Sequence, residues 1–136
     1  MNQTNSHDHC SGQAETHCPV ETAIGLVGGK YKSLILWKLA GGTLRFSQLK
    51  KEVPCATPRM LTRQLRELEA DGLISRQVFP VVPPRVEYSL TDFGQSIRPV
   101  LEALYEWGSL YLNRQGLEAN CTMVPLQQKN PGSGPE

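Results

Sequence analysis

Apolar positions along the chain follow first a helical and then a strand period. Between residues 18 and 72 apolar side chains recur every three or four residues, which is the spacing of one helix face. Over residues 73–90 the period becomes two, with Val86, Tyr88 and Leu90 on one face of a strand. The helical period returns after Thr91. The pattern predicts a mainly α protein with a small β-hairpin, an α+β fold.

Capping and turn residues divide the first helical region. Pro19 after Cys18 marks a helix start, because proline is favoured in the first helical turn, and Gly28-Gly29 ends that helix. Residues 30–42 predict a second helix that a second glycine pair ends. Residues 43–45 are expected to form a short extended link.

A helix-turn-helix is expected over residues 47–72. Ser47 has the chemistry of an N-cap and opens a brief helix over residues 47–53. Thr57, followed by proline, opens a longer helix that ends at Gly72. Only the short turn 54–56 separates the two helices, which is the spacing of a helix-turn-helix.

The longer of these two helices separates its side chains by chemistry. Its apolar face is expected to point into the core and consists of Leu61, Leu65 and Leu68. A different face carries guanidinium and hydroxyl groups without an acid, namely Arg59, Thr62, Arg63 and Arg66. A merely solvated helix usually mixes Glu with Lys or Arg along a row, so this row favours DNA recognition over a plain solvated face.

Residues 73–78 and 85–90 predict two paired strands, and FPVVPP (79–84) lies between them. Proline has no backbone N–H, so this tip cannot pair fully. A stiff tip formed by Pro83 and Pro84 beside Arg85 suits a wing laid against DNA. A plain hairpin loop is the alternative from this segment alone.

Thr91 is expected to cap one long last helix, from Asp92 to about Asn113, which Pro99 should bend. Its predicted apolar row is Phe93, Ile97, Leu101, Leu104, Trp107 and Tyr111. A small domain has difficulty burying so much of one helix, and packing against a second subunit is the natural solution.

The charge of the chain is unevenly distributed. The whole chain carries a net charge of +1, but residues 30–85 hold 11 basic and 4 acidic side chains. Such a basic region is typical of a surface that binds a polyanion. No apolar run approaches the roughly 20 residues that span a bilayer, and no leader is evident, so we expect a cytoplasmic protein with free thiols.

Four segments carry a family resemblance: CPVETAIGLVGGKYKSLIL (18–36), LRFSQLKKEVP (44–54), TPRMLTRQLRELEADGLISR (57–76) and VPPRVEYSLTDFG (82–94). They resemble the HxlR-type family of winged helix-turn-helix regulators, which is related in fold to the MarR group. The resemblance extends from Cys18 to about Gly116, so residues 1–17 and 117–136 are expected to be flexible tails. Tyr31 and Cys55 depart from the family pattern, which commonly has Trp and Gly there.

The resemblance implies a homodimeric, sequence-specific DNA-binding transcriptional regulator that binds an inverted-repeat operator, and not an enzyme. The expected DNA-binding residues are Ser47, Lys50, Lys51, Thr57, Arg59, Thr62, Arg63, Arg66, Arg76, Pro84 and Arg85. The first and last helices would form the dimer, through Val20, Ile24, Leu101, Leu104, Trp107 and Tyr111.

Cys18 is the candidate sensor of an oxidant or electrophile, because family members often respond through the cysteine before the proline. A helix N-terminus also favours the thiolate. Cys10 or Cys121 is a candidate disulfide partner, and a small packing residue is the alternative role for Cys18. His7, His9 and His17 with these cysteines could bind zinc, but their spacing is not a structural-zinc pattern, so no metal or cofactor is expected.

Two alternative functions stay open from the sequence. The same fold could respond to a noncovalent small-molecule ligand held between the subunits instead of to thiol chemistry. It could also serve as a protein-interaction module without reading DNA. The row of arginines without an acid argues against the interaction module.

Overall fold

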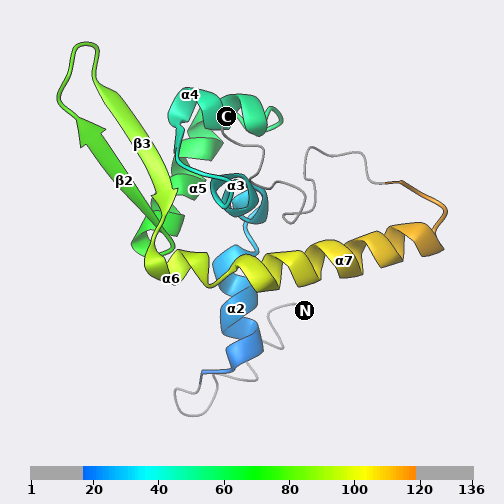
Figure 1. Cartoon of the computed structure of the whole chain (residues 1–136). Helices are drawn as coiled ribbons and strands as arrows, with labels where there is room; N and C mark the ends of the chain where they lie inside the picture. The colour runs from blue at the N-terminus through cyan, green and yellow to red at the C-terminus, as the bar shows by residue number, and fades with distance from the viewer. Residues whose placement is uncertain (1–16, 119–136) are drawn as a thin grey trace.

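The computed structural model describes residues 17–118. Its helices are α2 (Pro19–Val27), α3 (Lys32–Leu39), α4 (Phe46–Glu52), α5 (Pro58–Ala70), α6 (Asp92–Gln95) and α7 (Arg98–Arg114). Its strands are β1 (Leu44–Arg45), β2 (Ile74–Phe79) and β3 (Arg85–Leu90). Figure 1 shows α3, α4 and α5 gathered at the centre, the β2–β3 hairpin projecting from them, and α7 extending away on another side. The predicted mainly α fold with a small hairpin, a winged helix-turn-helix, is confirmed.

The three strands form one antiparallel sheet in the order β1-β3-β2. Leu44 pairs with Tyr88, which joins the link before α4 to the middle of the hairpin. Ile74 pairs with Leu90 and Phe79 pairs with Arg85, so β2 and β3 are aligned over their full length. Tyr88 and Leu90 are buried and Val86 is half-buried, which confirms the predicted alternation on β3.

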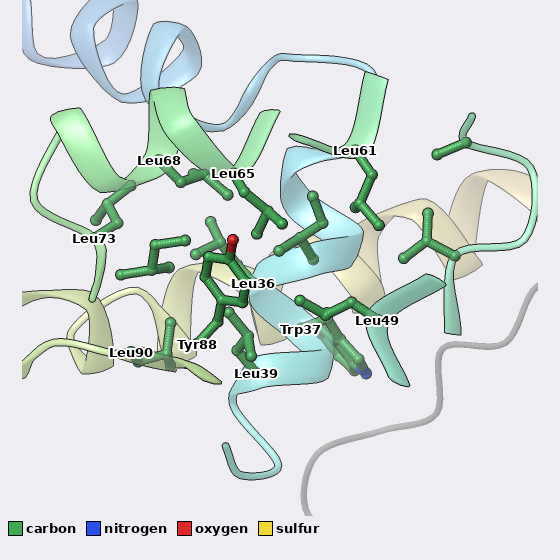
Figure 2. Packing of buried hydrophobic residues seen from close by; sticks show 14 of the residues in the cluster. Leu36, Trp37, Leu39, Leu49, Leu61, Leu65, Leu68, Leu73, Tyr88 and Leu90 are labelled. Carbon is green, nitrogen blue, oxygen red and sulfur yellow. The ribbon is translucent and has the colours of Figure 1, made fainter. Parts of the chain in front are cut away.

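The core is centred on α3. Ile35, Leu36 and Trp37 have no exposed surface. Figure 2 shows α3 surrounded by leucines of α5 and by Tyr88 and Leu90 of β3. A helix that is apolar on several sides must be covered on several sides, so α3 becomes the element on which the others pack.

Local capping sets the two ends of α5 as predicted. The Thr57 hydroxyl accepts a hydrogen bond from the Met60 N–H at 3.1 Å, and Pro58 occupies the first turn. At the other end Gly72 takes φ +81°, a left-handed conformation that favours glycine. The chain reverses there because the Leu73 N–H donates back to the Leu68 carbonyl at 3.0 Å.

The predicted N-cap of α4 is wrong by two residues. Helix α4 begins at Phe46 with Arg45 as its N-cap, so Ser47 lies inside the first turn. The cause is Gln48, whose side-chain oxygen accepts a hydrogen bond from the Arg45 N–H at 2.8 Å. A glutamine three residues after the cap supplies this half of a capping box.

The single bent C-terminal helix is also wrong, because the chain forms two helices. Ser96 and Ile97 donate to carbonyls three residues back, the tighter spacing of a turn between α6 and α7. Pro99 then lies in the first turn of α7, where a missing N–H has no helical partner to lose. Pro99 therefore helps to start α7 and does not bend it.

Helix α7 docks on α3 through one face. Leu101 is only 1% exposed, the Tyr105 ring stacks on Trp37 with centroids 5.2 Å apart, and Arg98 Nη1 donates to the Ala40 carbonyl oxygen at 2.7 Å. The predicted apolar row is thus two rows. Ile97, Leu101 and Tyr105 face the core, while the exposed row contains Val100, Leu104, Trp107 and Tyr111.

Thr91 links the end of α5 to the start of α6. Its hydroxyl accepts from the Gly94 N–H at 2.9 Å and donates to the Gly72 carbonyl at 2.7 Å.

We predict that Thr91→Ala lowers the free energy of unfolding by about 1–2 kcal/mol, measured by urea denaturation. Thr91→Ser, which keeps the hydroxyl, should retain most of this stability. Equal losses in both variants would assign the effect to the methyl group.

Candidate nucleic-acid interface

The outward face of α5 is the centre of the candidate interface. The inward leucines Leu61, Leu65 and Leu68 are at most 1% exposed, which fixes the rotation of the helix against α3. That rotation turns the other row outward: Arg59 and Arg66 are exposed, Thr62 is half-buried, and the Arg63 side chain is 71% exposed. The predicted separation of apolar and basic faces on this helix therefore holds in three dimensions.

Three hollows on the surface show which predicted residues lie together. One hollow, of about 550 Å³, is lined along α5 by Pro58, Arg59, Thr62, Arg63, Arg66 and Glu67. A second, between α5 and the hairpin, brings Arg66 and Thr62 together with Arg76. A third lies between the start of α4 and the hairpin tip and joins Ser47 to Pro84 and Arg85. None of these three is lined by Lys50 or Lys51, which follow on α4.

The β2–β3 hairpin carries Arg85 at its tip end, where the strands meet the loop, and Arg76 lies closer to its base. Val82 at the tip is 98% exposed, and Pro84 is exposed. The Arg85 guanidinium lies 4.7 Å from the centre of the Phe79 ring, and its Nε lies 3.2 Å from Glu87 Oε2. Arg85 is therefore held by an aromatic face and a carboxylate, which orients it on the flank of the wing.

The acid Glu67 lies next to Arg63, although the sequence predicted a row without an acid. Glu67 Oε1 lies 2.8 Å from the Lys32 Nζ, and Glu67 Oε2 lies 3.7 Å from the Arg63 Nε. The hydrogen bond and the positive charge of Lys32, with a smaller effect of Arg63, hold the pKa of the Glu67 carboxyl below its ordinary value of 4.5. The i,i+4 spacing of Arg63 and Glu67 could have indicated their contact. Nothing local in the sequence points to Lys32.

Cys18 is the N-cap residue of α2, which confirms the helix start predicted from Pro19, and it is partly exposed. Its thiol makes no capping hydrogen bond, and its carbonyl accepts from the Thr22 N–H at 2.9 Å. Cys55, in the turn of the helix-turn-helix, is exposed. The candidate partners Cys10 and Cys121 lie outside the described residues.

The predicted dimer residues divide into two groups. Leu101 belongs to the protomer's own core and has almost no surface left for a partner, which corrects its assignment. The other five are exposed by 44–70%: Val20, Ile24, Leu104, Trp107 and Tyr111. Part of this surface is a continuous apolar groove of about 540 Å³ between α2 and the α6–α7 region, lined among others by Val20, Ile24 and Leu104.

Within residues 17–118, no set of three or more His, Cys, Asp or Glu side chains is placed to hold a metal ion. Of the candidate metal ligands at the N-terminus, His7, His9 and Cys10 precede the described part of the chain. None of the described helices is both long and apolar enough to cross a membrane.

A helix-turn-helix with a β-hairpin wing and an arginine-rich outward face defines a winged helix-turn-helix transcriptional regulator. The family model of the HxlR-like helix-turn-helix matches residues 26–116, and the chain belongs to this family. An uncharacterized HTH-type transcriptional regulator of Methanothermobacter thermautotrophicus is 55% identical over 104 residues, which are 76% of this chain and 79% of that protein.

Solved structures of redox-related regulators share the fold. The oxidized form of the redox regulator HypR matches with a TM-score of 0.64 and 47% identity, covering 67% of this chain and 94% of that one. The reduced form of the transcriptional regulator YodB from B. subtilis matches with a TM-score of 0.62 and 33% identity, covering 69% and 93%.

The ion pair between Glu67 and Lys32 leads to a prediction about acid unfolding. Because its pKa is lower in the folded than in the unfolded protein, Glu67 contributes stability that is present above about pH 4.5 and lost as pH falls through the folded pKa. We expect Glu67→Gln to lose less stability than the wild type between about pH 5 and about pH 3, measured by urea denaturation.

Arg63→Ala is the control for this measurement, because it leaves Lys32, the main cause of the shift, in place. It should keep most of the acid sensitivity. If Glu67→Gln lost stability as steeply as the wild type, another carboxylate would dominate acid unfolding.

Proposed function

We propose that this protein is a sequence-specific DNA-binding regulator that reads bases with the outward face of α5. The observation that carries the proposal is the row of three arginines and Thr62 on the second helix of a helix-turn-helix. Arginine can donate to guanine O6 and N7 together, which discriminates that base by about 1–3 kcal/mol. Arg59, Arg63 and Arg66 are placed on the helix that enters the major groove in this motif.

Phosphate contacts would supply the sequence-independent part of the affinity. The candidates are Lys50 and Lys51 on α4, Arg76 on β2, which shares a hollow with Thr62 and Arg66, and Arg85 on the wing. Ser47 and Thr57 add hydroxyl groups at the starts of α4 and α5, and the Thr57 oxygen still has its hydrogen to donate after accepting from Met60. Such contacts fix the register of the protein on the duplex and make binding salt-dependent.

A homodimer is the assembly that this surface favours. The exposed apolar side chains Val20, Ile24, Leu104, Trp107 and Tyr111 lie on α2 and α7. Apolar surface of this kind at a contiguous site is typical of protein association. A two-fold dimer would place two α5 helices about 34 Å apart, which matches an inverted-repeat operator.

Oxidation or alkylation of Cys18 is the proposed control. Cys18 is partly exposed at the start of α2, and α2 contributes to the apolar groove beside α7. A hydroperoxide would oxidise the thiolate to a sulfenic acid, and a second thiol, such as Cys10 or Cys121, would displace water to form a disulfide. The redox regulator HypR, with its oxidized and reduced forms, supports this assignment by similarity.

Noncovalent control is the second candidate, favoured by the groove of about 540 Å³ between α2 and the α6–α7 region. Its lining is almost wholly apolar, so it would accept a hydrophobic small molecule. The two modes of control differ in whether the response needs Cys18.

We predict tight binding to the DNA upstream of the protein's own gene, compared with a shuffled duplex by fluorescence anisotropy. Arg63→Ala should weaken operator binding by about 1–3 kcal/mol and change binding to the shuffled duplex much less. Lys51→Ala is the matched control, since losing a phosphate contact weakens both duplexes alike. Equal losses for Arg63→Ala would assign Arg63 to the backbone, and equal wild-type affinity for both duplexes would refute sequence-specific regulation at this site.

We further predict that hydrogen peroxide shifts the operator affinity of the wild type several-fold and that a thiol reductant reverses the shift. Cys18→Ser should bind as the reduced wild type does and ignore the oxidant. Cys55→Ser, which leaves Cys18 in place, should respond like the wild type. A full response in Cys18→Ser would exclude Cys18 as the sensor.

A further inference from the structure

The turn between α2 and α3 and the first residue of α3 hold helix α5 through a hydrogen bond and an ion pair. The Tyr31 N–H donates to the Gln64 side-chain oxygen at 3.3 Å, and Lys32 Nζ lies 2.8 Å from Glu67 Oε1. Gly29 packs so closely that a Cβ there would lie 2.7 Å from the Gln64 oxygen. We call these five residues, Gly29, Tyr31, Lys32, Gln64 and Glu67, the Lys32 clasp.

Stability alone does not account for the charged pair in this clasp. The Lys32 side chain is 9% exposed and that of Glu67 is 44% exposed, so the lysine loses hydration that an exposed partner only partly replaces. The pair contributes to stability, and it also determines the surroundings of Arg63.

The surroundings that matter are those of Arg63. Glu67 Oε2, the oxygen that Lys32 does not hold, lies 3.7 Å from Arg63 Nε, which is a loose contact for a guanidinium. An unrestrained Glu67 carboxylate could turn both oxygens to Arg63 and bind it in a bidentate pair. That pair would use the same guanidinium donors that a guanine base needs.

We propose that Lys32 is a positioning residue for DNA recognition, which holds and neutralises Glu67 so that Arg63 stays available to the base. The inference rests on the proposed function and adds to it a specificity residue that does not itself face the DNA. Lys32 acts only through Glu67 on Arg63. Removing the acid should therefore cancel the effect of removing the lysine.

The experiment measures the operator-to-shuffled affinity ratio of variants by fluorescence anisotropy on the upstream duplex described above. Lys32→Met, which keeps the aliphatic length, should lower the ratio about tenfold, the loss expected when one arginine leaves a guanine. Lys32→Met combined with Glu67→Gln should restore the ratio to within about twofold of the wild type. Lys32→Arg, which keeps the positive charge, should retain it.

A second ion pair provides a matched control. Lys38 Nζ lies 3.1 Å from Glu52 Oε1, and the side chains are 9% and 45% exposed, nearly the same as in the Lys32–Glu67 pair. Lys38→Met removes an equally buried charge but leaves Glu67 and Arg63 untouched. It should keep the wild-type ratio. Circular dichroism melting of each variant separates loss of fold from loss of recognition.

Two further variants test the route through Arg63. In an Arg63→Ala background, Lys32→Met should cause no additional loss of the ratio, whereas a merely structural lysine would cause the same loss again. If Lys32→Met fails to fold, Glu67→Gln alone decides. Positioning predicts that this variant keeps the ratio, because Arg63 has lost its competitor, and a structural pair predicts that the ratio falls.

The outcomes distinguish this inference from the proposed function. A wild-type protein that does not discriminate between the duplexes overturns both. A wild-type protein that discriminates, with a Lys32→Met variant that discriminates equally well, overturns the inference alone. If Lys32→Met lowers the affinity ratio and the added Glu67→Gln substitution does not restore it, the inference is also overturned, because the lysine then acts by another route.

Discussion

The burial of α3 is the constraint on which the rest of the structure depends. With Ile35, Leu36 and Trp37 fully buried, this eight-residue helix needs cover on several sides. Helix α5 covers one side, β3 another, and α7 a third through the stacking of Tyr105 on Trp37. Each covering element uses its apolar face for this purpose, so what it presents to solvent is decided by what α3 requires.

For α5 this constraint produces the candidate recognition surface. Three leucines at most 1% exposed leave the helix a single rotation about its axis, and that rotation points the arginine row outward. Because the row is set by packing behind it, its geometry does not depend on the DNA being present. A preorganised row loses less side-chain and backbone freedom on binding than a mobile one. The core therefore sets the geometry of the candidate DNA-binding row as well as the stability of the fold.

Local chemistry could be predicted from the sequence, and long-range contacts could not. Thr57-Pro58 and Gly72 mark the ends of α5 because a cap, a proline ring and a left-handed glycine act within a few residues. The start of α4 was predicted at Ser47 since a hydroxyl is the stronger cap signal, yet Gln48 reaching back to Arg45 decides it. Helical period placed Leu101 and Leu104 in one row, but only the docking of α7 on Trp37 shows that they separate. The contact of Lys32 with Glu67 joins α3 to α5, and no periodic pattern in the sequence indicates it.

Helix α2 connects the two halves of the proposed function, which are control by Cys18 and DNA binding by α5. Helix α2 has Cys18 as its N-cap, lines part of the apolar groove and has no fully buried residue, and only Leu26 and Val27 at its end pack against the core. It ends at Val27, two residues before Gly29 of the Lys32 clasp. In the proposed control, a cue that moves α2 would act on the turn between α2 and α3 as well as on the core. Gly29 lies against the Gln64 side chain, so a shift of this turn would change a contact with α5. In the proposed mechanism, the Lys32 clasp therefore links the candidate sensor Cys18 to Arg63, the candidate base reader.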